Sequence, residues 1–132
     1  MKIIVQKFGG TSVATAEARI AARNKVSEAI KAGFTPAVVV SAMGRKGDPY
    51  ATDSLIDIIK KENSSVDSRD LDTIMCCGEL ISAAVMAASL QSVGINAAAL
   101  TGGQAGIKTD ANFGDAKIRN INPANLLLYM NA

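Results

Sequence analysis

At residues 7–12 the chain reads Lys7-Phe8-Gly9-Gly10-Thr11-Ser12, between the β-branched run Ile3-Ile4-Val5 and an alanine-rich segment that begins near Val13. This order predicts a strand, a glycine turn and then a helix. The two glycines remove Cβ atoms from the turn, so backbone N–H groups there can come close to a charged ligand. We expect Thr11 or Ser12 to be the N-cap of the helix, because hydroxyl side chains bind its first free N–H groups.

The turn is a candidate anion-binding site. The Lys7 amine, the turn amides and the hydroxyls suit the β- and γ-phosphates of a nucleotide. Alternatively, Gly9-Gly10 is only a tight turn and Lys7 a solvated charge, and this stretch alone does not separate the two interpretations. It is neither a Walker A loop nor a Gly-x-Gly-x-x-Gly motif, because the residues that follow the glycines differ from both.

Composition indicates one soluble globular unit. The 132 residues are 48% apolar and 4% aromatic, which suffices for one core. The net charge of +2 comes from interspersed signs, so we expect neither nucleic acid nor a membrane surface as a partner. The N-terminal apolar run is broken at Gln6, and we expect no membrane span and a cytoplasmic location.

Two residue types limit the possible chemistry. The chain has no histidine, which excludes a histidine-based triad or zinc site. Cys76 and Cys77 are adjacent within a helical stretch, where they point in different directions and cannot form an ordinary disulfide with each other. We expect packed free thiols rather than a redox or metal site.

The first half of the chain predicts a parallel crossover. Apolar residues between Ala18 and Ile30 recur at helical spacing, Gly33 ends that helix, and Ala37–Val40 is typical of a strand buried on both faces. Ligands of such sheets bind beyond the carboxyl ends of the strands. The glycine turn and the loop from Ser41 to Ala51 both leave from that edge.

The second half predicts further elements. Asp48 or Thr52 is expected to cap a helix that carries apolar residues from Leu55 to Ile59. A long helix is predicted from Arg69 to Val93, followed by a third strand over Asn96–Leu100. A glycine-rich loop over Thr101–Gly106 is expected at the same sheet edge. The chain then returns near Gly114 with a strand over 116–121, and a helix opens in 123–130.

Glu79 is the only charged residue between Ile74 and Leu90. It shares a helix stripe with Met75, Cys76, Ala83 and Met86, so we expect it to be buried. A buried carboxylate needs a cationic partner. That partner is either a ligand ammonium or a cation elsewhere in the fold.

Four segments together resemble the aspartokinases, within the amino acid kinase superfamily. They are Val5–Val13, Val40–Gly44, Gly78-Glu79 and Thr101–Ile107. The resemblance implies an α/β/α three-layer sandwich with a largely parallel central sheet. It also implies ATP-dependent phosphorylation of the side-chain carboxylate of L-aspartate to 4-phospho-L-aspartate, in the synthesis of lysine, threonine and methionine.

The resemblance also implies roles for individual residues. Lys7 would balance charge on the transferring phosphoryl group, and the phosphate end of the ATP site would be lined by Phe8, Gly9, Gly10 and Ser41. Thr52, Asp53 and Glu79 would contact aspartate, with Glu79 on its ammonium group. Mg²⁺ would bind mainly through ATP phosphates, so no metal ligand is assigned to the chain.

The resemblance covers residues 1–132 as the N-terminal part of a catalytic domain. Segments that hold adenine and ribose, a further substrate arginine and the regulatory ACT domains are expected to be absent from it. We therefore expect little kinase activity from the chain alone, and a homo-oligomer for the complete protein. Two alternatives stay open: an amino acid kinase for another acid such as glutamate, and a non-catalytic phosphate-binding or assembly fragment.

Overall fold

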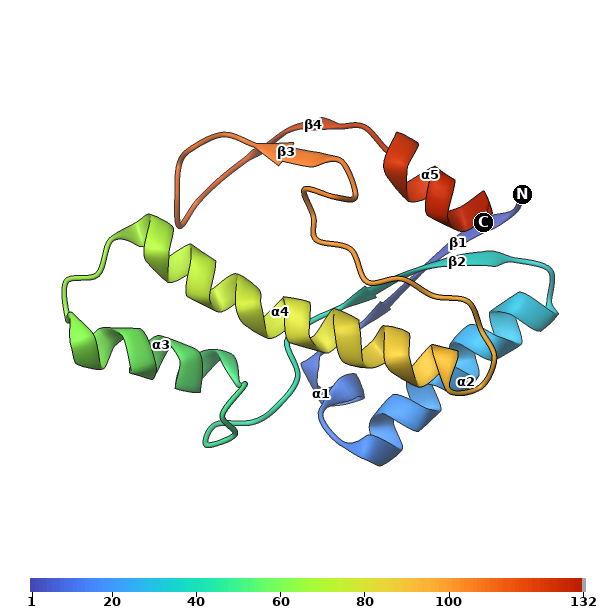
Figure 1. Ribbon diagram of the computed structural model, residues 1–132, viewed down its shortest axis with the longest axis horizontal. Helices are drawn as coiled ribbons and strands as arrows, with labels where there is room; N and C mark the ends of the chain where they lie inside the picture. Colours follow the sequence, from blue (N-terminus) through green and yellow to red (C-terminus); the bar gives the residue numbers. More distant parts are fainter. Residues whose placement is uncertain (132) are drawn as a thin grey trace.

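The computed structural model describes residues 1–131, which form an α/β fold around one parallel strand pair (Figure 1). The strand–turn–helix–strand order predicted for the first forty residues is confirmed. The elements are β1 (Ile3–Phe8), α1 (Gly10–Val13), α2 (Ala16–Lys31), β2 (Thr35–Val40), α3 (Thr52–Glu62), α4 (Ser68–Gln91), β3 (Ile107–Thr109), β4 (Ile118–Ile121) and α5 (Ala124–Asn131).

The parallel sheet is covered by helices on one face. β1 and β2 pair in parallel from Ile3 with Thr35 to Phe8 with Val40. Phe8 and Val40 belong to the face that packs against the core of α2 and α4, whereas Val5 on the opposite face is 68% exposed. The prediction that β2 is buried on both faces is therefore wrong, because the third layer of the sandwich is not formed among residues 1–131.

Helix α2 has the predicted apolar stripe. Ala22, Val26 and Ala29 are buried, and Gly33 with a φ of 84° follows the helix end. The predicted start of the helix is wrong. Gly9, with no side-chain cap, precedes the separate short helix α1, and Thr15 caps α2 by accepting a hydrogen bond from the N–H of Ala18.

Helix α4 begins after Asp67, whose side chain accepts a hydrogen bond from the Arg69 N–H, and it ends within two residues of the predicted boundary. Its buried stripe has a spacing of four: Gly78, Ser82, Met86 and Leu90. The prediction of a helix buried all round is wrong, because α4 packs only through this side and its flanks. Cys76 and Cys77 are free and exposed rather than packed.

Length and composition would also allow α4 to cross a membrane. Its most apolar 18-residue window has a mean hydropathy of 1.7, and 22% of that window is buried. Core helices of soluble proteins meet the same criterion, and α4 packs against α2, α3 and β2.

The predicted third strand over residues 96–100 is not formed. Gln91 Nε2 instead donates a hydrogen bond to the Ala97 carbonyl at 2.8 Å. This side chain therefore gives the carbonyl the hydrogen bond that a neighbouring strand would give. Beyond this stretch, β3 and β4 form an antiparallel hairpin and α5 follows. The predicted return near Gly114, the short strand and the final helix are confirmed.

Candidate functional site

Two loops leave the carboxyl ends of β1 and β2 side by side. The Ser41 N–H donates a hydrogen bond to the Phe8 carbonyl at 3.1 Å, which extends the pairing by one residue. A Cβ atom at Gly10 would lie 3.1 Å from the Ala42 carbonyl oxygen. The glycine therefore permits the close approach of the turn to the loop after β2.

Helix α4 meets the same loop through Gly78. A Cβ atom there would lie 3.2 Å from the Ala42 Cβ and 3.6 Å from the Tyr50 carbonyl oxygen. Ala42 thus lies against both Gly10 and Gly78. The structure brings together the glycine turn, the loop after β2 and the middle of α4, all in one region of Figure 1.

Lys7 and Glu79 lie on different sides of these segments. Lys7 alternates with Phe8 along β1, so its side chain is on the sheet face opposite to α4, which carries Glu79. Lys7 is exposed near the end of β1, and it forms no ion pair within residues 1–131. Glu79 is also exposed and is likewise without an ion pair in the described part of the chain. The prediction that Glu79 is buried is wrong, because its neighbour Gly78 occupies the packed side of α4.

Thr52 and Asp53 form the first turn of α3, directly after Tyr50-Ala51. Thr52 is half-buried and Asp53 is exposed. Neither Asp48 nor Thr52 caps this helix, since its N-cap is Ala51 without a side-chain hydrogen bond. Asp48 instead accepts a hydrogen bond at 2.8 Å from the Arg45 N–H, which closes the preceding loop on itself.

The Thr101–Gly106 loop does not join this cluster through any hydrogen bond recorded for residues 1–131. The Gln104 carbonyl accepts a hydrogen bond from Asn125 Nδ2 at 2.7 Å, and the Gly106 carbonyl accepts one from the Asn122 N–H at 2.9 Å. These bonds tie the loop to the start of α5. The site therefore consists of two loops and a helix, rather than the three loops that the sequence predicts.

Sequence reasoning missed the position of Arg19. Its Nη1 atom donates hydrogen bonds to the carbonyl oxygens of Val13 at 2.9 Å and Ala14 at 3.3 Å. The same atom lies 3.9 Å from Sδ of Met43. Nothing in the local pattern separates Arg19 from the solvated cations of α2, since the contact depends on where the second loop lies.

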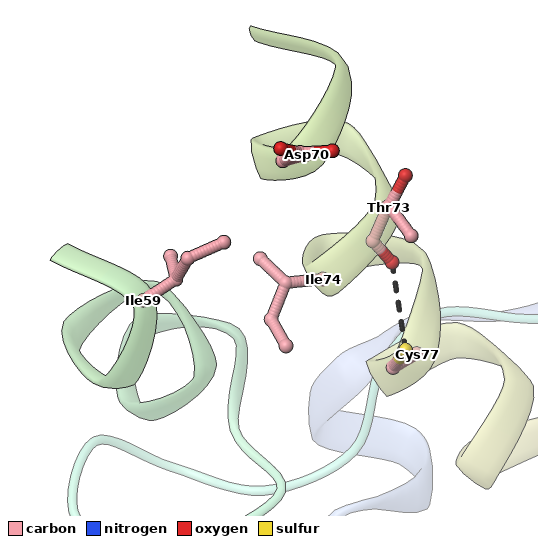
Figure 2. A pocket seen from close by; sticks show the side chains of 5 residues that line it. All are labelled: Ile59, Asp70, Thr73, Ile74 and Cys77. Atoms are coloured by element: carbon pink, nitrogen blue, oxygen red, sulfur yellow. Dashed lines mark hydrogen bonds between the residues drawn. The ribbon is translucent and has the colours of Figure 1, made fainter. Parts of the chain in front are cut away.

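A separate groove of about 290 Å³ runs between α3 and α4 (Figure 2). Ile59 and Ile74 face one another across it, and Cys77 Sγ lies 3.5 Å from the Thr73 carbonyl oxygen. No residue of the candidate site lines the groove. The residues that line it are Ile59, Asp70, Thr73, Ile74 and Cys77.

Comparison with known proteins identifies the family of the chain. Residues 2–132 match the amino acid kinase family. Aspartokinase 1 of Bacillus subtilis (strain 168) is 50% identical over 126 residues, which cover 96% of this chain and 31% of that protein. The aspartokinase of Geobacillus stearothermophilus is 43% identical over 121 residues, or 92% of this chain and 28% of that protein.

A solved structure is also similar. The crystal structure of aspartate kinase from Synechocystis superposes with a TM-score of 0.61 at 35% identity, over 70% of this chain and 15% of that one. The chain spans 31% of the length of the Bacillus subtilis relative. Its fold is an incomplete α/β amino acid kinase fold. The match over residues 2–132 shows that the chain belongs to the amino acid kinase family.

Proposed function

We propose that this chain provides the phosphate-binding end and the aspartate contacts of an aspartokinase. The reaction transfers the γ-phosphoryl group of ATP to the side-chain carboxylate of L-aspartate, which gives 4-phospho-L-aspartate. One observation carries the proposal. Ala42 lies against both Gly10 and Gly78, so the turn that follows Lys7 adjoins the helix that carries Glu79.

The phosphate end is the turn of Phe8, Gly9 and Gly10 together with Ser41. The first N–H groups of a helix have no partner within it, and no side-chain cap occupies the start of α1. The Ser12 N–H donates to the Gly9 carbonyl at 2.9 Å, so the N–H groups that precede it in the turn are the ones proposed to bind phosphate oxygens. Lys7 adds a full positive charge that is not neutralised by an ion pair among residues 1–131.

The aspartate end is formed by the start of α3 and by α4. Glu79 is proposed to bind the ammonium group of the substrate, and Thr52 and Asp53 to bind its other polar atoms. The approach of the Tyr50 carbonyl to Gly78 supports this grouping, because it holds the first turn of α3 near Glu79. The names of the relatives support aspartate as the acceptor.

In the proposed step, a carboxylate oxygen of aspartate attacks the γ-phosphorus. A new O–P bond forms, the bridging bond between the β- and γ-phosphates breaks, and its electron pair leaves with ADP. No general base is required, because the side chain of free aspartate is ionised at neutral pH. Lys7 would offset charge on the transferring group, so catalysis would consist of positioning and charge stabilisation.

We propose that Mg²⁺ binds together with ATP through its phosphates, where it would neutralise part of their charge. Within residues 1–131, no group of three or more carboxylate or thiol side chains could hold a metal ion. The steps assigned above use protein groups alone.

We further propose a cytoplasmic location, a role in lysine, threonine and methionine synthesis and a homo-oligomeric complete protein. For the 132 residues alone we propose binding with little turnover, because they span 31% of the length of the Bacillus subtilis relative.

The test is calorimetry on the purified chain with Mg-ATP and L-aspartate, followed by a hydroxamate assay for acyl phosphate. We expect ATP to bind and L-aspartate to bind more tightly than L-glutamate. Glu79→Gln should weaken aspartate binding, whereas the matched variant Glu62→Gln at the end of α3 should not. Absence of ATP binding, or equal binding of glutamate, would contradict the proposal.

A further inference from the structure

Arg19 is a half-buried cation that the proposed chemistry does not use. It lies in the first turns of α2, where it reaches back to the end of α1. Its Nη1 donates to the carbonyl oxygens of Val13 and Ala14 at 2.9 and 3.3 Å. No carboxylate among residues 1–131 forms an ion pair with it, so these carbonyl groups are its hydrogen-bond partners.

These hydrogen bonds fix a sharp junction. The last four carbonyl groups of a helix receive no hydrogen bond from an N–H group of the same helix. Helix α1 has only four residues, so this applies to its whole length. Val13 is 1% exposed, so its carbonyl needs a protein partner more than an exposed one would. Arg19 satisfies it on one side of the junction, while Thr15 caps α2 on the other. Together they hold the junction between α1 and α2.

The same guanidinium touches the second loop. Met43, which is 7% exposed, presents Sδ at 3.9 Å from Nη1 of Arg19. Met43 follows Ala42, whose carbonyl oxygen lies against Gly10. One side chain therefore contacts the end of the short helix that follows the glycine turn and the loop that follows Ser41.

We propose that Arg19 is a positioning residue, which holds the glycine turn and the segment Ser41–Met43 in one arrangement for a polyphosphate ligand. The identity of the ligand rests on the proposed function. The linking role of Arg19 rests on its contacts with Val13, Ala14 and Met43, and it does not depend on which ligand binds.

The test compares Arg19→Leu with Arg23→Leu. Arg23 is the matched control, since it lies one turn later on α2 and, among residues 1–131, its Nη1 donates only to Ser92 Oγ at 3.4 Å. The first readout is the ¹³C-methyl NMR signal of Met43, assigned with Met43→Leu. The second is calorimetric titration of the whole chain with Mg-ATP, and the third is the thermal midpoint.

We expect Arg19→Leu to shift the Met43 signal and to weaken ATP binding about tenfold, as loss of one charge-assisted hydrogen bond implies. Arg23→Leu should do neither. In Arg19→Ala, millimolar guanidinium chloride should restore part of the ATP affinity, and in Arg23→Ala it should change nothing. A general loss of stability would not be reversed in this way.

The outcomes separate the two hypotheses. An unchanged Met43 signal in Arg19→Leu, or an equal loss of affinity in both leucine variants, overturns the positioning role. If the wild-type chain binds no ATP, the proposed function fails and the phosphate role of Arg19 fails with it. The Met43 signal then decides by itself whether Arg19 links the two segments.

Discussion

Lys7 is the residue at which binding and stability are expected to separate most clearly. Its side chain is exposed and makes no ion pair within residues 1–131, so Lys7→Ala should change the free energy of unfolding by less than about 0.5 kcal/mol. Loss of a charge-assisted contact to phosphate should raise the Kd for ATP roughly tenfold. Calorimetry and urea unfolding measure the two effects.

Lys2→Ala is the control for Lys7→Ala, because Lys2 is also exposed and precedes the same strand. It should leave both the Kd and the free energy of unfolding unchanged. Equal ATP affinity in wild type and Lys7→Ala would remove Lys7 from the site.

Ser82 offers a test of packing at one residue. It is 2% exposed, and its Oγ has no hydrogen-bond partner among the described residues. A buried unsatisfied hydroxyl costs about 1–3 kcal/mol, so Ser82→Ala should raise the free energy of unfolding by about 1 kcal/mol. Urea unfolding measures this, with the half-buried Ser89→Ala as control. Destabilisation by Ser82→Ala would mean that the hydroxyl has a partner after all.

At the scale of elements, the β3–β4 hairpin depends on Gly106. Its φ is 89°, and a Cβ atom there would overlap the carbonyl oxygen of Asn122. Gly106→Ala should therefore destabilise the hairpin by more than the roughly 1–2 kcal/mol that a left-handed conformation costs an ordinary residue. Amide hydrogen exchange over β3 and β4 measures the loss.

Gly103→Ala is the matched control in the same loop. Its added Cβ would meet nothing closer than Thr101 Oγ1 at 3.9 Å, and its φ is not in the left-handed region. Exchange rates in β3 should therefore stay at the wild-type values. Similar rates in the two variants would show that the close approach of Asn122 to Gly106 does not hold the hairpin together.

The hairpin should also respond to acid through Asp110. Backbone N–H groups of Lys117 and Asn112 donate to its carboxylate, and the Arg119 guanidinium does so at 2.8 Å. These donors, the Lys117 N–H first, hold the pKa of Asp110 below its ordinary value of 3.8, although partial burial opposes them.

The sign of the acid effect follows from that direction. Because the pKa is lowered in the folded hairpin, the ionised carboxylate stabilises it fully above the ordinary pKa, and this contribution is lost as pH falls through the folded value. The Lys117 amide signal should titrate with a midpoint below 3.8, and Asp110→Asn should abolish that titration. A midpoint at or above 3.8 would contradict the assignment.

At the scale of the whole molecule, two apolar surfaces are open. Val5 at 68% and Val39 at 47% lie on the uncovered sheet face, and Leu80 at 44% and Ile81 at 37% lie on α4. Contiguous apolar surface promotes association, and so do the free edges of a two-stranded sheet. The 132-residue chain should therefore self-associate as its concentration rises.

Light scattering with a charge variant tests this association. Val5→Lys should raise the concentration at which association begins, because it places a charge in the sheet face. Ile58→Lys on α3 adds the same charge at a position that is 54% exposed but outside both surfaces, and should have a smaller effect. A monodisperse monomer at high concentration would show that these surfaces do not cause association.

Local chemistry made part of this structure predictable. A β-branched run before two glycines, the stripe of Ala22, Val26 and Ala29, and a glycine at the end of α2 each act within a few residues. They predict the presence and order of β1, α2 and β2. The Gly78-Glu79 pair was also visible in the sequence. Its packing against Ala42 was not, because that contact joins residues far apart in the chain.

The sequence by itself determined the order of the helices, the parallel crossover and the segments that carry the family resemblance, because these depend on local backbone preference and on spacing. Only the tertiary structure decided that Glu79 is exposed, that residues 96–100 form no strand and that Arg19 contacts Met43. Burial and long-range contacts belong to pairs of elements. They follow from which surfaces meet in space, and the pattern of one segment does not contain that information.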